Sequence, residues 1–175
     1  MTTTIDLTTP TPTVIRSADA QNRTLHLVDI ENLSGGPTVR PGRHVDAWRA
    51  FVRRAGVRDT DQVVVAACER VMRTLMFELP SWVSKHSAIG ADGADRVLLG
   101  VGTPGWIAQR FGRVVIGSGD HAFAELGREL LALGVQVIVV SGAGHRSRDL
   151  VGQGFGIRSI DLGRRPEQDD LGLIV

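Results

Sequence analysis

Hydrophobic residues along the chain fall into short continuous runs separated by longer segments of mixed polarity. Four of the runs are almost wholly apolar, at 25–30, 62–68, 113–117 and 135–140. Strands of this composition are buried on both faces, as they are in a parallel sheet. We place two further strands only loosely, around 87–89 and 158–161.

The segments between these runs have the spacing of amphipathic helices. In 43–55, and again in 121–133, apolar residues recur every three or four positions. We predict three more helices, over 69–79, over 93–101 and from Pro104 to a point before Gly112. Alternating strands and helices predict an α/β fold, a three-layer α/β/α sandwich with a central, mainly parallel sheet.

Length and composition agree with one such domain. The chain has 175 residues, of which 42% are hydrophobic and 22% charged, so it can bury a sizeable core. The first segment is rich in Thr and Pro and has little to bury. We therefore expect a flexible leader at 1–22, a single domain at 23–162 and a C-terminal tail at 163–175.

Charge and cysteine content exclude several classes of protein. A net charge of +1 excludes a histone-like polycation, although it leaves room for a local basic surface. The single cysteine, Cys68, excludes an internal disulfide framework and a zinc site built from cysteines. No run reaches the ~18 apolar residues of a membrane span, and residues 1–13 lack the pattern of a secretory signal. We expect a cytoplasmic protein without a membrane partner.

Carboxylate residues stand where the predicted strands end or where the following helices begin. Three separate segments contain these residues and their polar neighbours: Asp29, Glu31 and Asn32; Asp92 and Asp95; and Ser118 and Asp120. In open parallel sheets, ligands bind beyond the carboxyl ends of the strands. We therefore expect the three segments to meet at one edge of the sheet.

Carboxylates that are brought together repel one another unless a cation lies between them. Ligands that are all oxygen atoms favour Mg²⁺ or Mn²⁺. Such a site activates water and neutralises charge on a phosphodiester.

Each residue also has a purely structural explanation. Ser118 and Asp120 are good helix caps, and Asp92 with Asp95 resembles a capping pair. Asp29 is harder to explain in this way, because it interrupts a buried strand and a buried carboxylate needs a partner. The segment 117–122 also fits the G-x-G-x-x-[GA] dinucleotide-binding pattern, but Asp120 would repel a pyrophosphate there.

These segments, in this order, resemble the NYN domain, a branch of the PIN-like nuclease superfamily. LVDIENL at 27–33 is similar to the family's opening D-x-x-N segment, and DGADRVLL at 92–99 is similar to its K-G-x-D helix start. Residues 114–141 look like the S-G-D-x-D-F segment with its helix and final strand. The resemblance covers most of the chain between residues 24 and 141.

The resemblance implies a metal-dependent endoribonuclease that hydrolyses RNA phosphodiester bonds. By this resemblance the catalytic residues are Asp29, Asn32, Asp95 and Asp120. Asp29, Asp95 and Asp120 would bind Mg²⁺ or Mn²⁺, Asn32 would orient a carboxylate, a water or a phosphate, and Ser118 would shape the turn.

The chain departs from the family pattern at two positions. The family's Lys before G-x-D is Asp92 here, and the second Asp of S-G-D-x-D-F is Ala122. Asp92 and Glu31 are auxiliary carboxylates, either of which could replace the missing acid. The departures leave open a second function, a catalytically weakened NYN domain that binds RNA or protein without cutting.

RNA as a partner requires positive charge near the acidic edge. The loop after the last clear strand contains His145, Arg146 and Arg148, and its position predicts that it emerges at the carboxyl edge. Residues 40–58 hold six arginines against Asp46, but an arginine-rich helix face is often only solvated surface. A second copy of the chain or another protein partner also stays open.

Overall fold

The apolar runs form one sheet in the computed structural model, which describes residues 16–40, 42–150 and 153–162. The strands of this sheet are β1 (Thr24–Asp29), β2 (Gln62–Cys68), β3 (Ser84–Ala88), β4 (Arg113–Gly117), β5 (Gln136–Ser141) and β6 (Gly156–Ser159). The helices are α1 (Ala18–Asn22), α2 (Ile30–Ser34), α3 (Arg43–Ala55), α4 (Glu69–Leu75), α5 (Gly93–Leu99), α6 (Pro104–Arg110), α7 (Phe123–Ala132) and the 3₁₀ turn η1 (Arg148–Leu150).

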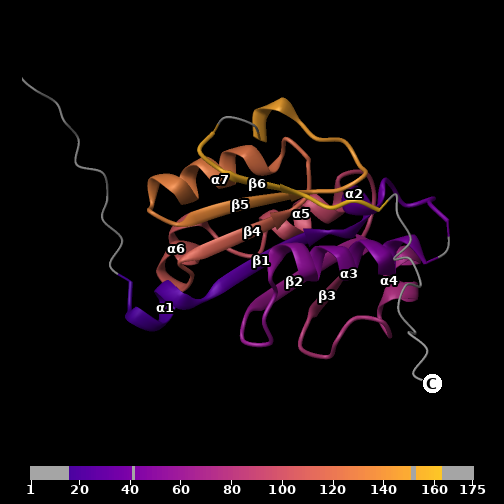
Figure 1. Cartoon of the computed structure of the whole chain (residues 1–175), viewed down its shortest axis with the longest axis horizontal. Coiled ribbons are helices and arrows are strands. Elements are labelled where there is room, and N and C mark those ends of the chain that lie inside the picture. The colour runs from indigo at the N-terminus through magenta and orange to yellow at the C-terminus, as the bar shows by residue number, and fades with distance from the viewer. Residues whose placement is uncertain (1–15, 41, 151–152, 163–175) are drawn as a thin grey trace, which may run out of the picture.

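All neighbouring strands of the sheet are parallel, in the order β3-β2-β1-β4-β5-β6 (Figure 1). The first strand, β1, lies inside the sheet. β2 and β3 follow it on one side, and β4, β5 and β6 lie on the other side. The register places Asp29 opposite Ala66 of β2 and Val28 opposite Gly117 of β4. In doubly wound sheets, ligands bind where the strand order reverses, here between the carboxyl ends of β1 and β4.

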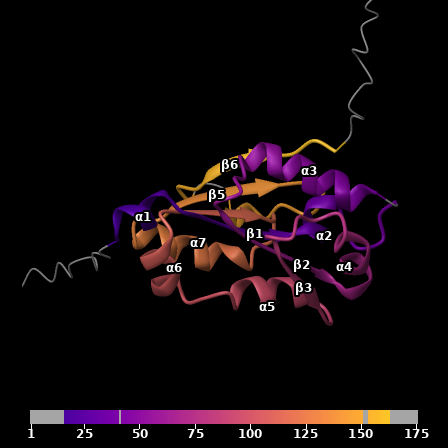
Figure 2. The same cartoon turned by 90° about the horizontal axis from the view of Figure 1, so that it is seen from below.

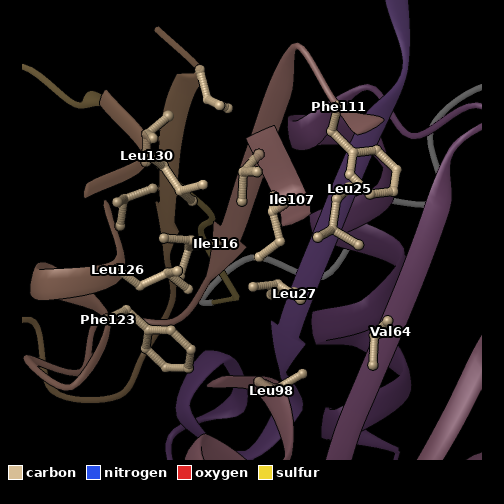
Figure 3. Packing of buried hydrophobic residues seen from close by; sticks show 14 of the residues in the cluster. Leu25, Leu27, Val64, Leu98, Ile107, Phe111, Ile116, Phe123, Leu126 and Leu130 are labelled. Atoms are coloured by element: carbon tan, nitrogen blue, oxygen red, sulfur yellow. The ribbon is translucent and has the colours of Figure 1, made fainter. Parts of the chain in front are cut away.

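Helices cover both faces of the sheet, which gives the three layers expected from the sequence (Figure 2). Successive residues of a strand point to opposite faces, so Leu27 and Val28 of β1 enter different cores. Leu27 packs with α5, α6 and α7, in the cluster drawn in Figure 3. Val28 packs with α2, α3 and α4.

The four central strands and the helix over 43–55 confirm the sequence prediction. The helix expected over 121–133 runs from Phe123 to Ala132, and those expected over 69–79 and 93–101 end earlier, at Leu75 and Leu99. Both loosely placed strands are present, shifted to 84–88 and 156–159. The sheet is wholly parallel in the described residues, where the sequence predicted a mainly parallel one.

The leader predicted at 1–22 is wrong at its C-terminal end, because residues 18–22 form helix α1. Ser17 caps this helix by accepting a hydrogen bond from the N–H of Ala20, at 3.2 Å. Arg16 ties the segment to the body by donating to the backbone carbonyls of Ala108, Leu133 and Gly134. The rest of the leader, 1–15, and the tail at 163–175 lie outside the described residues.

None of the helices in the described ranges has the length and apolar character needed to cross a membrane.

Candidate functional site

A cleft of about 310 Å³ opens at the carboxyl edge of the sheet, where β1, β2 and β3 end and α5 begins. It brings together all three of the chain segments that the sequence analysis singled out. Five carboxylate residues line it: Asp29, Glu31, Asp92, Asp95 and Asp120. Asn32, Cys68 and His145 also line it, together with several glycines.

Asp29 lies at the end of β1 and is the N-cap of α2. Its Oδ1 accepts hydrogen bonds from the N–H groups of Glu31, at 3.0 Å, and Asn32, at 3.1 Å. The side chain is 8% exposed. Burial raises the pKa of Asp29 to about 7, and the nearby carboxylates of Asp95 and Glu31 also raise it, against the opposing effect of the two N–H donors. The two capping bonds are made to Oδ1. Burial keeps the pKa of the carboxyl group close to neutral pH.

Asp95 lies in the first turn of α5 and is 7% exposed. Its Oδ1 is buried and has no hydrogen-bond partner among the described residues. Burial raises the pKa of Asp95 to about 6, and the negative charges of Asp120 and Asp92 add to the effect. A buried acceptor without a donor is costly, so this oxygen is available for a ligand.

The capping explanation for Asp92 and Asp95 does not hold. Asp92 occupies the N-cap position of α5, yet its side chain makes no capping bond within the described helix. Its backbone adopts a left-handed conformation with φ of 53°, which is uncommon outside glycine. Asp92 is exposed at the rim of the cleft, whereas Asp95 lies buried within it.

Ser118 and Asp120 shape the turn that follows β4. The hydroxyl of Ser118 accepts a hydrogen bond from the N–H of Asp120 at 3.1 Å, and Asp120 Oδ1 accepts one from the N–H of Ala122 at 2.9 Å. Asp120 Oδ1 also lies 2.9 Å from Nδ1 of His121. Ser118 is fully buried, so it positions the turn, and Asp120 faces the cleft.

Asn32 connects helix α2 to two loops at the cleft. Its Oδ1 accepts a hydrogen bond from the N–H of Gly119 at 2.8 Å, and its Nδ2 donates to the carbonyl of His145 at 3.4 Å. Its own carbonyl accepts a bond from the N–H of Gly144 at 2.9 Å. Asn32 therefore positions the backbone of both loops, and the bonds of its side chain go to backbone groups and not to a carboxylate.

Gly119 allows the two loops to approach this closely. A Cβ atom at this position would lie 2.1 Å from the carbonyl oxygen of His145 and 2.9 Å from the Cα of Arg146. The carbonyl of Gly119 accepts a hydrogen bond from the N–H of Ser147 at 2.7 Å. Both backbone groups of this glycine are thus already paired.

We predict that Gly119→Ala lowers the free energy of unfolding by about 1–3 kcal/mol, the usual cost of forcing extra atoms into a packed region. The loop 142–147 has to move, because the contact is with backbone. Urea denaturation measures the change. Gly105→Ala in α6 is the matched control, since a Cβ there meets nothing within 4 Å. Equal stability of the two variants would contradict the prediction.

Glu31 and Cys68 form a contact that the sequence analysis did not foresee. The backbone N–H of Cys68 donates to Glu31 Oε2 at 3.2 Å, across the ends of β1 and β2. Burial raises the pKa of the Cys68 thiol, and its hydrogen bond to Glu31 raises it further. The position of Cys68 at the carboxyl end of a central strand was the available signal.

The predicted RNA-binding residues lie on the loop that Asn32 holds. His145 lines the cleft. Arg146 and Arg148 are exposed on the same loop, although they are not among the residues that line the cleft. The arginines of 40–58 do not line it either, and several of them make other contacts, such as Arg43 with the carbonyl of Ser34 at 2.7 Å and Arg58 with Asp61 at 2.8 Å.

The donor set fits a hydrated divalent cation better than a tightly coordinated one. Two residues that line the cleft each have a buried carboxylate oxygen, Asp95 Oδ1 and Glu31 Oε1, without a partner in the described part of the chain. In those residues, no three His, Cys, Asp or Glu side chains are grouped closely enough to form a ready-made metal site. Mg²⁺ usually keeps several waters and needs only one or two direct carboxylates, so it does not require such a group.

Comparison of the chain with protein-family models, with curated proteins and with solved structures gave no match.

Proposed function

We propose that this protein is a Mg²⁺- or Mn²⁺-dependent endoribonuclease of the NYN or PIN-like type. The observation that supports it is the meeting of five carboxylates from three chain segments in one cleft, with a buried and unpartnered oxygen on Asp95. Carboxylates in this arrangement repel one another, and a divalent cation is the natural charge to offset them. Its single cysteine agrees with a cytoplasmic location, which is part of the same proposal.

In this proposal Asp29, Asp95 and Asp120 hold the cation. When bound, the ion neutralises charge on the phosphodiester and lowers the pKa of a water molecule. The protein's own contribution is positioning. Asn32 and Gly119 hold the turn after β4 against α2, which fixes Asp120 relative to Asp29. The first turn of α5 supplies Asp95.

RNA is the proposed substrate because the acidic cleft has basic groups beside it. His145 reaches the cleft, and Arg146 and Arg148 are exposed on the same loop. Phosphate contacts by such residues give affinity that does not depend on sequence and falls with salt. A free nucleotide bound by the turn at 117–122 is disfavoured, because the N–H of Gly119 is already bonded to Asn32.

A second candidate function keeps the fold and the RNA surface without cleavage. Ala122 favours it, because this N-cap residue of α7 stands where the resembled family has a second acid. A binding module of this kind would hold RNA or a protein partner without a divalent ion.

Metal dependence of RNA cleavage separates the two functions. We expect the purified protein to cut an internally labelled single-stranded RNA in the presence of Mn²⁺ or Mg²⁺, and to stop when EDTA is in excess. Gel analysis of the products measures this. Retention of intact RNA in a salt-sensitive complex that is indifferent to EDTA would instead favour the binding module.

A further inference from the structure

Two buried carboxylate oxygens in the cleft lack a hydrogen-bond donor, and only one of them belongs to the three acids assigned above. They are Asp95 Oδ1 and Glu31 Oε1, both without a partner among residues that the structure describes. The acids come from different segments, at the start of α5 and within α2. Because an unpaired buried acceptor is costly, two of them in one cleft point to a shared ligand that is positively charged.

Glu31 is held in place through its other oxygen. Oε2 accepts the backbone N–H of Cys68 at 3.2 Å. The backbone of Glu31 is fixed as well, since its N–H bonds to Asp29 and its carbonyl accepts from Gly35 and Gly36 at 3.0 and 2.7 Å. The side chain thus has one oxygen anchored to β2 and the other one free for a ligand.

Asp29 is in direct contact with Glu31, because its Oδ1 accepts the backbone N–H of Glu31 at 3.0 Å. Asp29, Glu31 and Asp95 all line the same cleft. Glu31 therefore belongs to the same cluster of charge as Asp29 and Asp95. Asp92 differs from Glu31, because Asp92 is exposed and Glu31 is half-buried.

We propose that Glu31 is a fourth carboxylate that holds the hydrated cation of this cleft, with Oε1 as the atom that binds the ion or one of its waters, and that Asp92 is not part of the set. The inference rests on the proposed function for the identity of the ion, a hydrated divalent cation. The sequence left open whether Glu31 or Asp92 replaces the missing acid. This inference assigns that role to Glu31.

Binding of Mn²⁺ to the full-length protein tests this assignment without any measurement of cleavage. Isothermal titration with MnCl₂ gives the affinity of wild type, Glu31→Gln, Asp92→Asn and Glu69→Gln. Glu69 is the matched control, since it is exposed and pairs with Arg73 on the surface. We expect Glu31→Gln to weaken Mn²⁺ binding by about 10-fold or more, because loss of even an outer-shell partner costs about 10–100-fold. Asp92→Asn should weaken it by less than about 3-fold, as expected for a rim charge at a distance, and Glu69→Gln should not change it.

The outcomes separate this inference from the proposed function. Unchanged Mn²⁺ affinity in Glu31→Gln, or an equal loss in Asp92→Asn, would overturn the inference and leave the nuclease proposal standing. Loss of Mn²⁺ binding in Glu31→Gln, with no RNA cleavage by the wild type, would support the inference and reject the nuclease. Absence of Mn²⁺ binding by the wild type would reject both. Thermal unfolding in EDTA checks that each variant is folded.

Discussion

Replacing Asp29 or Asp120 with Asn is expected to lower metal-dependent RNA cleavage by more than about 100-fold, the upper end of what loss of an outer-shell metal partner costs. Both residues are proposed to hold the hydrated cation. Both substitutions keep the local structure, because the Oδ1 of Asn can still accept the backbone bonds that Asp29 takes from α2 and Asp120 takes from Ala122.

Initial rates of cleavage with Mn²⁺ measure this loss, with each variant purified in the same way as the wild type. Asp59→Asn is the matched control, since Asp59 is exposed in the turn between α3 and β2. It should cleave at the wild-type rate. Full activity in both site variants would show that the cleft is not the place where RNA is cut.

Asp29→Asn should also make the metal-free protein more stable at pH 8, by up to about 4 kcal/mol. Burial raises the pKa of Asp29 from 3.8 to about 7, so the folded protein holds this proton more tightly than the unfolded chain. Stability is therefore lost as the pH rises from about 4 to about 7. Asn resembles the protonated acid and escapes that loss.

Urea denaturation in EDTA between pH 4 and pH 8 measures the effect. The two proteins should have similar free energies of unfolding near pH 4, and the variant should become increasingly more stable up to pH 8. Comparison with Asp59→Asn removes the contribution of other titrating groups. If the difference in the free energy of unfolding stayed constant with pH, the pKa of Asp29 would not be raised in the folded state.

In the proposed function, the carboxylate of Asp29 lowers the stability of the metal-free fold and helps to hold the cation. A neutral residue at position 29 suits the metal-free fold, and a carboxylate suits the cation. Sites that trade stability for activity in this way are common in enzymes.

The central sheet could be predicted from the sequence because its inner strands are apolar on both faces. All residues of β1 are buried, and so are the middle residues of β2. The outer strands β3 and β6 are mostly exposed and polar, with sequences SKHSA and GIRS, so they left no hydrophobic run to detect. Helices α1 and α2 have only five residues each, too few for helical periodicity to be visible.

The position of the site could be predicted from a topological rule, whereas the contacts within the site could not. The carboxyl ends of parallel strands meet at one edge, which placed Asp29, Asp95 and Asp120 in one cleft. The bond from Asn32 to the carbonyl of His145 joins residues 113 positions apart, and no pattern in the sequence indicates it. The contact between Glu31 and Cys68 depends on a side-chain conformation that only the folded structure fixes.

The central claim is that the carboxylates of this cleft jointly bind a divalent cation. The most direct test is anomalous X-ray scattering from crystals of the full-length protein soaked in MnCl₂. We predict an anomalous peak between Asp29, Asp95 and Asp120, and its absence from crystals of the Asp29→Asn/Asp120→Asn variant soaked in the same way. No peak in the cleft of the wild type, or an undiminished peak in the variant, would contradict the claim.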